Sequence, residues 1–593
     1  MMFENKKLDF DLFCKQTSYR AYDYMGVHKT DRAELSFRVW APNAKEVYLV
    51  GDFNQWSHSR PMKKITENGI WEIFVSNAEF YEGGLYKYKI ISADGKELYK
   101  ADPYARCTPK PPETASVYYD IGSYEWHDAG WLSNRRKNMT SKKAKSQPIN
   151  IYELHLSSWK KREDGSPYSY VELARELVPY VKQMGYTHIN LEPITEYPYD
   201  GSCGYQTCSY YAPTSVFGTP REFMELVDIL HSAGVGVILD FAPMQYSKDE
   251  QGLCSFDGQP IYEDIKRNEV QSFFISNVIF WLEKYHIDGI LVDEISSMLF
   301  DGDEISFFKK LNLQLKENFP DALVIAGDCG EYKNITGDKK DSLGFAFSLN
   351  KEWTKDTLSY MEKDPIYRKY HHNEMIRAVE RSLGKETVLS VTHNEVAFGK
   401  RSLLDKMYGS YNEKFASERV FLGYMMTLPG KKLLFMGAEL GQFCEWRFCG
   451  QTDWSLLGYE RHAQMQKYVS DLNMFYLENR ALWEKDADPC GFEWLDPSNS
   501  DMSIISYKRV DKDGQELYVT VNFTPVLRKK YKLAANEKAT YYEVFNSDNM
   551  QYGGDGILNK GEIKSQTSDK ASKQFEISIN VPPLSVVILK KIK

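Results

Sequence analysis

The sequence lacks the features that mark membrane, secreted and nucleic-acid-binding proteins. No uninterrupted apolar run reaches the roughly 18 residues that a membrane span needs, and the opening MMFENKKLDFDLFCKQ has no apolar core of a signal peptide. The nine cysteines form no CxxC pair, so neither a disulfide framework nor a zinc finger is predicted. The net charge of -9 comes from interspersed acids and bases, not from blocks of one sign. We therefore expect a cytoplasmic protein with reduced thiols, a neutral ligand, and no binding to nucleic acid or membrane.

Aromatic side chains are abundant instead. They make up 14% of the chain, with 41 Tyr and 12 Trp, within a hydrophobic share of 42%. Flat amphipathic rings suit the faces of sugars, although ordinary core packing accounts for most of them. A length of 593 residues corresponds to roughly three or four domains of the usual size, with large buried cores.

The pattern of apolar and polar residues divides the chain into three folded parts and a linker. Residues 1–125 show short alternating strands and an Asp-Gly hairpin turn in GLYKYKIISADGKEL, which predicts an N-terminal β-sandwich. NRRKNMTSKKAKSQP is basic and has no apolar periodicity, so residues 126–148 are interpreted as a linker. Residues 149–485 alternate strands with helices, and residues 486–593 return to strands that predict a C-terminal β-sandwich.

Eight strand candidates follow one another in the central part. Repeated strand-helix units of this number predict a (β/α)8 TIM barrel, so the fold class is a multidomain α/β protein with a β-sandwich before and after the barrel. One expected helix, NEVQSFFISNVIFWLEKYH, places its apolar residues near one face for packing on the barrel wall. The strand candidates are IYELHL, THINLEP, GVILDFAP, GILVDEI, LVIAGD, FAFSLN, TVLSVTHN and KLLFMGAE.

Segments near the strand ends, where barrel enzymes keep their active sites, resemble a known family. GDFNQW, ELHLSSW, DGSCGYQTCSYYAPTSVFGTP, DGILVDE, KDPIYRKYHHNE, THNEVAFGK, PGKKLLFMGAELGQ and VTVNFTPV occur in this order. Together they resemble the bacterial 1,4-α-glucan (glycogen) branching enzymes of the α-amylase superfamily, glycoside hydrolase family 13, over most of the chain. The resemblance implies an α-glucan ligand, such as glycogen, amylose or a maltooligosaccharide, and retaining transglycosylation in glycogen biosynthesis, without cofactor or metal.

The resemblance also implies a catalytic set of three carboxyl groups, of which the nucleophile and the acid stand about 5–5.5 Å apart. The nucleophile is retained as Asp293, but Leu291 replaces an arginine that favours its ionised form. Gly327 stands at the position of the acid, and Asn394 replaces the third carboxylate. Asp328 comes one residue after the acid's position, where a strand points its side chains to the opposite face, so it could substitute only if the strand end twisted or bulged.

Five further positions correspond to sugar-binding residues of the family. Asp200, Tyr205, Asp240 and His393 match the family, with Tyr205 expected to stack on a sugar ring. Gln245 stands where the family has a histidine that contacts the sugar in the cleavage subsite. Two loops, after SFDGQPIYE and after SSMLF, are also shorter than in the family, which removes contacts at the barrel face that carries specificity.

Several cysteines fall in segments expected near this face. Cys203 replaces a tryptophan of the family, and Cys444 replaces an arginine. Because thiolates bind zinc strongly, a metal or redox site built from such cysteines is conceivable, but their spacing is irregular and we assign no metal. The other four are Cys208, Cys254, Cys329 and Cys449.

The substitutions favour one of three functions. A branching-enzyme homologue whose catalytic residues have decayed would serve as a glucan-binding or regulatory pseudoenzyme of glycogen metabolism. An active branching enzyme, with Asp293 as nucleophile and Asp328 as surrogate acid, is the first alternative. The second is a structural partner that no longer binds glucan. The sequence predicts no particular protein partner.

Overall fold

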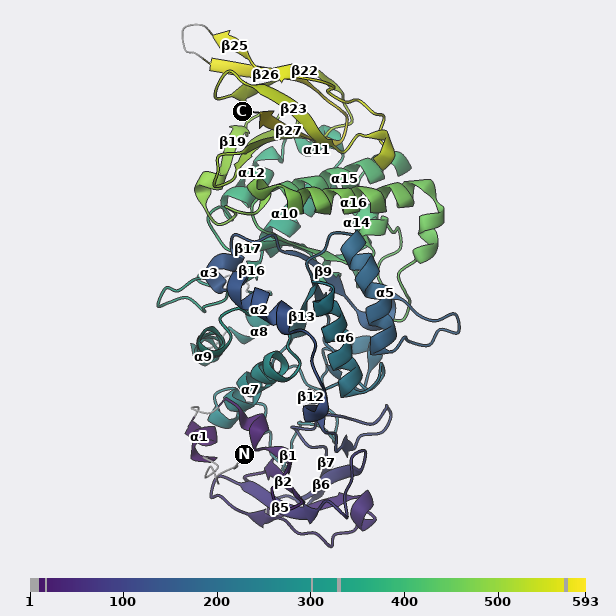
Figure 1. Cartoon of the computed structure of the whole chain (residues 1–593), viewed down its shortest axis with the longest axis vertical. Helices are drawn as coiled ribbons and strands as arrows, with labels where there is room; N and C mark the ends of the chain where they lie inside the picture. The colour runs from purple at the N-terminus through teal and green to yellow at the C-terminus, as the bar shows by residue number, and fades with distance from the viewer. Residues whose placement is uncertain (1–9, 16–18, 300–301, 328–331, 570–573, 593) are drawn as a thin grey trace. The chain divides into compact units, whose positions relative to one another are not determined.

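The computed structural model of the chain describes residues 10–15, 19–299, 302–327, 332–569 and 574–592 (Figure 1). The chain separates into two compact units, here called the first and the second unit and described one by one. In the described part of the chain, no helix combines the length and the apolar character that crossing a bilayer requires. The first unit comprises Met1–Arg136, His155–Val178 and Asn190–Phe345, and the second comprises Lys137–Leu154, Pro179–Ile189 and Ala346–Lys593.

Eight strands close into a barrel, which confirms the predicted fold class, and each strand candidate forms one of them. Their order around the barrel follows the chain, with β9 beside β18. The register places Asp240 beside Leu291, and Leu291 beside Ile325. Their side chains are almost all buried, as expected of parallel strands that are covered on both faces. The barrel strands are β9 (Asn150–Leu154), β10 (His188–Leu191), β13 (Gly236–Phe241), β14 (Gly289–Val292), β15 (Leu323–Ala326), β16 (Phe347–Leu349), β17 (Thr387–Val391) and β18 (Lys431–Phe435).

Helices alternate with these strands, and their ends carry local start signals. Helix α6 begins at Pro220 after a capping box, in which Thr219 accepts from the Glu222 backbone and Glu222 reaches back to Thr219. The longer helices are α2 (Ala129–Asn138), α5 (Tyr170–Gln183), α6 (Pro220–Ser232), α7 (Asn268–Lys284), α9 (Gly302–Asn318), α10 (Lys351–Met361), α12 (His372–Glu380), α15 (Tyr411–Thr427) and α16 (Glu460–Glu478). The short ones are α1 (Phe10–Lys15), α3 (Ser141–Ala144), α4 (Leu156–Trp159), α8 (Ile295–Met298), α11 (Pro365–Arg368), α13 (His393–Val396) and α14 (Leu403–Lys406).

The N-terminal strands, purple in Figure 1, form two antiparallel sheets, β1-β2-β5-β4 and β3-β6-β7 with β8 beside β6. The predicted Asp-Gly turn joins β6 to β7, and Gly95 there adopts a φ of +89°, which glycine tolerates without strain. The strands are β1 (Gly26–Lys29), β2 (Glu34–Trp40), β3 (Glu46–Gly51), β4 (Lys63–Lys64), β5 (Ile70–Ser76), β6 (Leu85–Ile91), β7 (Glu97–Lys100) and β8 (Ser116–Val117). A separate pair consists of β11 (Thr195–Glu196) and β12 (Ser209–Pro213).

The C-terminal strands also form two sheets, β19-β20-β21-β27-β23-β24 and β22-β26-β25, yellow-green to yellow in Figure 1. Tyr518, Tyr531, Ile577 and Leu589 belong to one buried apolar cluster that both sheets share. The strands are β19 (Phe492–Asp496), β20 (Ile504–Val510), β21 (Glu516–Asn522), β22 (Arg528–Ala535), β23 (Thr540–Asn546), β24 (Ile563–Lys564), β25 (Gln566–Asp569), β26 (Gln574–Val581) and β27 (Ser585–Ile592).

Helix α7 forms where the sequence predicts it but is buried on more than one face. Every residue from Val270 to Leu282 is buried, polar ones included. The N-terminal segment supplies the additional cover: the Ala21 backbone donates to Ser276 Oγ at 3.0 Å, and the Tyr22 and Phe280 ring centroids lie 5.3 Å apart. The one-face prediction is incomplete, because the apolar periodicity of a helix does not show which polar residues a second neighbour will cover.

Residues 126–148, interpreted from the sequence as a linker, contain helices α2 and α3. Arg135 of α2 is buried and donates from Nη1 to Asp288 and from Nε to Asp321, both at 2.8 Å. The basic residues that suggested a linker thus include at least one, Arg135, whose charge is paired inside the fold.

Candidate functional site at the barrel strand ends

The first unit brings two of the predicted sugar-binding residues into direct contact. Asp240 lies near the end of β13 and is buried, and its Oδ2 accepts from the Tyr205 hydroxyl at 2.8 Å. Tyr205 is held on the loop that follows the 3-10 helix η4 (Asp200–Ser202), where Asp200 is exposed. A carboxylate fixed by a tyrosine at the carboxyl end of a strand is a polar, pre-organised group at the barrel face where such enzymes bind ligands.

Gln245 lies on the loop after β13, close to the Tyr205 loop. Its backbone carbonyl accepts from the Thr207 amide at 3.3 Å, and Thr207 forms an isolated parallel bridge with Tyr246. The Gln245 side chain is half-buried. The two loops that carry Tyr205 and Gln245 are therefore joined through their backbones.

The predicted nucleophile Asp293 follows β14 directly. Its backbone amide donates to the Phe241 carbonyl at 3.0 Å, and only 6% of the residue is exposed. Leu291, two residues earlier, points to the same face because side chains alternate along a strand. Leu291 is buried and can offer the carboxylate neither a positive charge nor a hydrogen bond, so the partner that an arginine would supply is absent at this position.

Gly327, at the position predicted for the acid, does not leave open space. Its amide donates to the Val292 carbonyl at 2.7 Å. A Cβ atom added to Gly327 would lie 2.7 Å from Asp293 Oδ1 and 2.8 Å from the Val292 carbonyl oxygen. Any side chain here would therefore require Asp293 and the backbone to move apart. Asp328, the proposed surrogate acid, lies outside the described residues, as does Cys329.

Three loops at these strand ends hold non-glycine residues in left-handed backbone conformation. Cys203 has a φ of 53°, Met244 a φ of 67° and Glu294 a φ of 56°. Such conformations are uncommon for residues with a side chain, and they gather at ligand sites when the surrounding structure imposes them. All three residues lie near predicted site positions, although other non-glycine residues with positive φ lie elsewhere in the described chain.

The second unit contains the other two predicted residues, His393 and Asn394. His393 Nδ1 lies 2.7 Å from Glu153 Oε1, and the His393 amide donates to the same oxygen at 3.3 Å. Asn394 is half-buried, and its backbone carbonyl accepts from Lys400 Nζ at 2.8 Å. The sequence did not predict that Glu153 orients His393. The signal for such a role was an acidic residue within the apolar run IYEL.

The structure also brings together three potential metal-ligating side chains that the sequence did not predict as a cluster. His155, Glu192 and Cys203, all in the first unit and all buried, offer ligand atoms that lie within 4.8 Å of one another. Burial, together with the carboxylates of Glu192 and Asp200, raises the pKa of the Cys203 thiol to about 12. His155 and Glu192 are polar residues at the ends of the strand candidates IYELHL and THINLEP, and this placement is the signal by which they could have been found.

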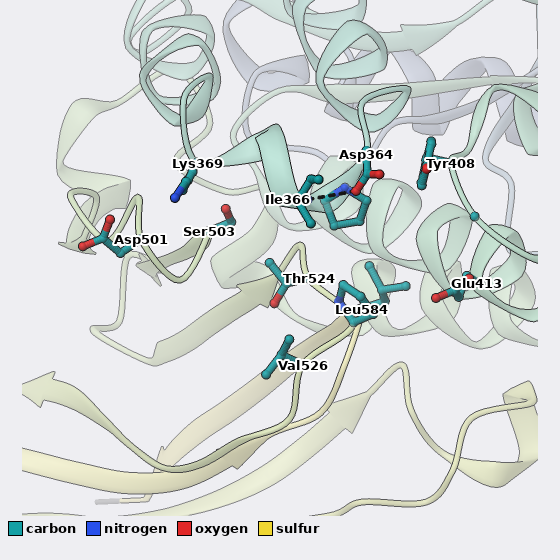
Figure 2. Close-up of a pocket in the computed structure, with 13 residues that line it drawn as sticks. Asp364, Ile366, Lys369, Tyr408, Glu413, Asp501, Ser503, Thr524, Val526 and Leu584 are labelled. Atoms are coloured by element: carbon teal, nitrogen blue, oxygen red, sulfur yellow. Dashed lines mark hydrogen bonds between the residues drawn. The ribbon is translucent and has the colours of Figure 1, made fainter.

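A separate cavity of about 440 Å³ lies wholly within the second unit (Figure 2). Its wall combines an aromatic ring, Tyr408, with apolar side chains such as Ile366 and Leu584, carboxylates such as Glu413, and hydroxyls such as Ser503. In Figure 2, Asp501, Ser503 and Lys369 lie on the left, and Tyr408 and Glu413 on the right. Rings for stacking beside groups that donate and accept hydrogen bonds are the features that polyhydroxylated ligands require.

Comparison with known families covers the three parts of the fold. Residues 24–105 match Carbohydrate-binding module 48 (Isoamylase N-terminal domain), residues 174–275 match the alpha amylase catalytic domain, and residues 494–592 match the alpha amylase C-terminal all-beta domain. Pullulanase from Bacillus acidopullulyticus has a similar fold, with a TM-score of 0.72 and 18% identity over 96% of this chain and 75% of that chain. The barrel, its strand-end residues and the two flanking β domains define a protein of the α-amylase class.

Relatives that match this chain over nearly their full length identify a particular family within this class. The 1,4-alpha-glucan branching enzyme GlgB of Halothermothrix orenii is 42% identical over 98% of this chain and 98% of its own length. GlgB of Bacillus caldolyticus is 41% identical over 99% of this chain and 92% of its own length. The chain therefore belongs to the 1,4-alpha-glucan branching enzyme GlgB family, which confirms the resemblance found in the sequence.

Proposed function

We propose that this member of the GlgB family binds α-glucan but does not branch it. The observation that carries this proposal is the contact at Gly327, where a Cβ would meet Asp293 Oδ1 at 2.7 Å and a backbone oxygen at 2.8 Å. No carboxyl group can stand at the acid's position while Asp293 and β14 keep their places. A missing proton donor alone slows such a reaction by about 10²–10⁴, because the leaving sugar must depart as an alkoxide.

Two further substitutions, Leu291 beside the nucleophile and Asn394 at the third carboxylate, support the same proposal. Leu291 leaves Asp293 without the cationic partner that would favour its charged form. Asn394 can hydrogen-bond to a sugar but carries no charge that would stabilise an oxocarbenium ion. Because residues that act as a unit have non-additive effects, further losses beyond the acid need not multiply the decrease in rate.

Retention of glucan is supported by the groups that remain. The hydrogen bond between Tyr205 and Asp240 keeps an aromatic ring and a carboxylate together at the barrel face. The match to Carbohydrate-binding module 48 and the cavity beside Tyr408 offer two further places for a saccharide. A glucan-binding protein without transferase activity would serve glycogen metabolism as a regulatory or targeting component.

Incubation of the purified chain with amylose tests the catalytic part of the proposal. We expect no fall in iodine absorbance and no new α-1,6 branch points under conditions in which GlgB of Halothermothrix orenii, as the reference protein, produces both. Branching by the chain that disappears in Asp293→Ala would overturn the proposal and favour the active enzyme with Asp328 as surrogate acid.

Affinity electrophoresis tests the binding part. Migration of the chain should be retarded in a native gel that contains glycogen. Tyr205→Ala and Tyr408→Ala show whether the barrel face or the cavity of the second unit is responsible, and Tyr459→Ala, which removes an exposed ring outside both, is the matched control. Unretarded migration of the unmodified chain would favour a structural partner without glucan binding.

Restoration of the family residues provides a stricter test. The triple variant Gly327→Glu, Asn394→Asp and Leu291→Arg returns all three charged groups. We expect no recovery of branching, because the new Cβ at position 327 conflicts with Asp293 and with the Val292 carbonyl. Recovery of branching would mean that the strand ends readjust and that the loss of activity rests on side chains alone.

A further inference from the structure

Three side chains of different metal-binding types meet in the first unit. His155 precedes helix α4, Glu192 follows β10, and Cys203 follows the 3-10 helix η4, so they come from three separate segments of the chain. Their exposed fractions are 6%, 2% and 4%, and one ligand atom from each lies within 4.8 Å of the other two. The three residues are not regularly spaced in the sequence, so no metal-binding motif predicts that they meet.

The three ligand types suit a zinc ion. Zinc takes nitrogen, oxygen and sulfur at about 2.0–2.3 Å, so ligand atoms in a tetrahedral site lie roughly 3–4 Å apart. A separation of up to 4.8 Å requires the three groups to approach by about an ångström, which side-chain rotation can provide. One imidazole, one carboxylate and one thiolate leave the fourth position of the ion for water, as in sites with three protein ligands.

The histidine is oriented as metal ligands commonly are. His155 Nδ1 lies 2.7 Å from Ser158 Oγ and 3.3 Å from Ser157 Oγ, and Ser157 Oγ also lies 3.4 Å from Nε2, where a metal would replace this longer contact. When Nδ1–H donates to a serine hydroxyl, the lone pair of the ring is on Nε2, where a metal can bind it. Hydrogen-bond partners on the second ring nitrogen fix the tautomer and the ring direction at metal centres.

The backbone brings the cysteine and the glutamate together. Cys203 has a φ of 53°, and its amide donates to the Asp200 carbonyl at 3.0 Å. At the next residue, Gly204, a Cβ would lie 2.2 Å from the Pro193 carbonyl oxygen, so only glycine allows this approach. Pro193 is the neighbour of Glu192. The contact between Gly204 and Pro193 therefore sets the Cys203 loop against the segment that carries Glu192.

We propose that His155, Glu192 and Cys203 form a binding site for a zinc ion. On binding, the Cys203 thiol releases its proton to solvent and its sulfur coordinates the metal, while His155 and Glu192 coordinate through Nε2 and a carboxylate oxygen. The ion would join the loop after η4, which carries Tyr205, to the ends of two strand segments. This site is distinct from the catalytic positions of the family that Asp293, Gly327 and Asn394 occupy, and it goes beyond the proposed glucan binding.

Cobalt serves as the probe on the unmodified chain, since it takes zinc sites and its spectrum reports sulfur coordination. The full-length protein, freed of metal by chelation and dialysis, is titrated with Co²⁺ and then with Zn²⁺. We expect a thiolate-to-cobalt charge-transfer band that saturates at one equivalent and disappears when zinc displaces cobalt. Absence of this band from the folded chain would overturn the proposal without the need for any variant.

Two cysteine variants show which thiolate produces the charge-transfer band. Cys203→Ser should abolish it and weaken zinc binding by at least about tenfold, the minimum effect of disturbing a metal centre. Cys208→Ser is the matched control: Cys208 lies five residues further along, its Sγ contacts the Glu196 carbonyl at 3.3 Å, and it is outside the group. The band should persist in this control. Its persistence in Cys203→Ser instead would place the metal elsewhere and overturn the assignment.

A third measurement keeps the test valid if Cys203→Ser fails to fold. In the unmodified chain, zinc should slow alkylation of Cys203 at least tenfold relative to Cys208, as mapped by peptide mass spectrometry. Equal rates with and without zinc would contradict the proposal. Because none of these measurements involves glucan, the zinc site and the proposed function can fail independently.

Discussion

The two ends of strands β13 to β15 differ in what their polar residues do. At the amino-terminal ends, Asp288 precedes β14 and accepts from Arg135 Nη1 and His231 Nε2, both at 2.8 Å, and from the Val237 amide at 2.6 Å. At the carboxyl ends stand Asp293, Leu291 and Gly327, and the resemblance described above predicts that Leu291 and Gly327 replace charged residues of the family. One end of the same strands holds a connected ion network, whereas the other end carries the positions at which we propose that catalytic groups are replaced.

The network at the amino-terminal ends extends well beyond one pair. His231 bridges Asp288 and Asp128 through its two ring nitrogens, each at 2.8 Å, and Arg135 Nε also binds Asp321 at 2.8 Å. Burial alone would raise the pKa of Asp288, but the charges of His231 and Arg135 outweigh it and hold that pKa well below its usual range. Burial likewise opposes the charged form of His231, yet the two aspartates raise its pKa to about 9.

On the function proposed above, the fold and the chemistry of the barrel rest on separate residues. In barrels of this kind the amino-terminal face serves stability, and the carboxyl face serves activity. Substitutions at Gly327 and Leu291 can therefore accumulate while the chain keeps a complete α-amylase-type fold. Membership of the branching-enzyme family follows from the fold and sequence, whereas activity depends on a few side chains.

The largest effect is expected from Asp288→Asn. An amide at this position leaves Arg135 and His231 without the buried charge that pairs with them, which should cost about 3–5 kcal/mol of the free energy of unfolding. Urea unfolding followed by tryptophan fluorescence measures the loss. A decrease below about 1 kcal/mol would contradict the view that this network holds the strand ends together.

The next effect concerns pH. Because the folded pKa of His231 is about 9 and the unfolded value is near 6.5, its stabilisation is complete below pH 6.5 and is lost as the pH rises through 9. The contribution amounts to about 3 kcal/mol over this interval. His231→Gln should flatten the fall of the urea midpoint between pH 6.5 and 9. An unchanged slope in the variant would assign the pH dependence to other groups.

A smaller effect is expected from Gly327→Ala at the opposite end. The added methyl group meets Asp293 Oδ1 and the Val292 carbonyl oxygen at less than 3 Å, so the backbone must shift at a cost of about 1–3 kcal/mol. Thermal unfolding of the variant beside Gly458→Ala, where no atom lies within 4 Å of the new Cβ and the backbone is not left-handed, separates the contact from the general effect of an added methyl group. Equal destabilisation of the two variants would remove the contact at Gly327 as the cause.

The smallest effect is expected from Asp293→Asn. The same change of side chain as in Asp288→Asn is made here on the other side of β14. It should change the free energy of unfolding by less than about 1 kcal/mol, because no ion pair of the network described above involves Asp293. Urea unfolding of the two variants side by side provides the sharpest form of the comparison. A loss as large as that of Asp288→Asn would show that both ends of β14 are structural.

The sequence predicted the barrel well because its strands are short apolar runs. GVILDFAP and GILVDEI became β13 and β14, and burial on both faces is what such runs indicate. Positions such as Asp293 and Gly327 could be assigned because motifs fix them on the strand ends. Their catalytic roles stay predictions from the resemblance.

Contacts between distant segments could not be predicted in the same way. Arg135 stands in a basic stretch that looks solvated, and only the fold places it beside Asp288 and Asp321. The grouping of His155, Glu192 and Cys203 likewise depends on loops that meet in space, for which one sequence carries no periodic signal.

The contacts of the N-terminal segment with helix α7 affect where the chain can be truncated. Because Ala21 and Tyr22 contact Ser276 and Phe280, residues before the first sheet complete the burial of a barrel helix. Deleting the N-terminal module would leave apolar surface on that helix, and such surface promotes aggregation. A boundary for separating the two parts would therefore have to leave Ala21 and Tyr22 with helix α7.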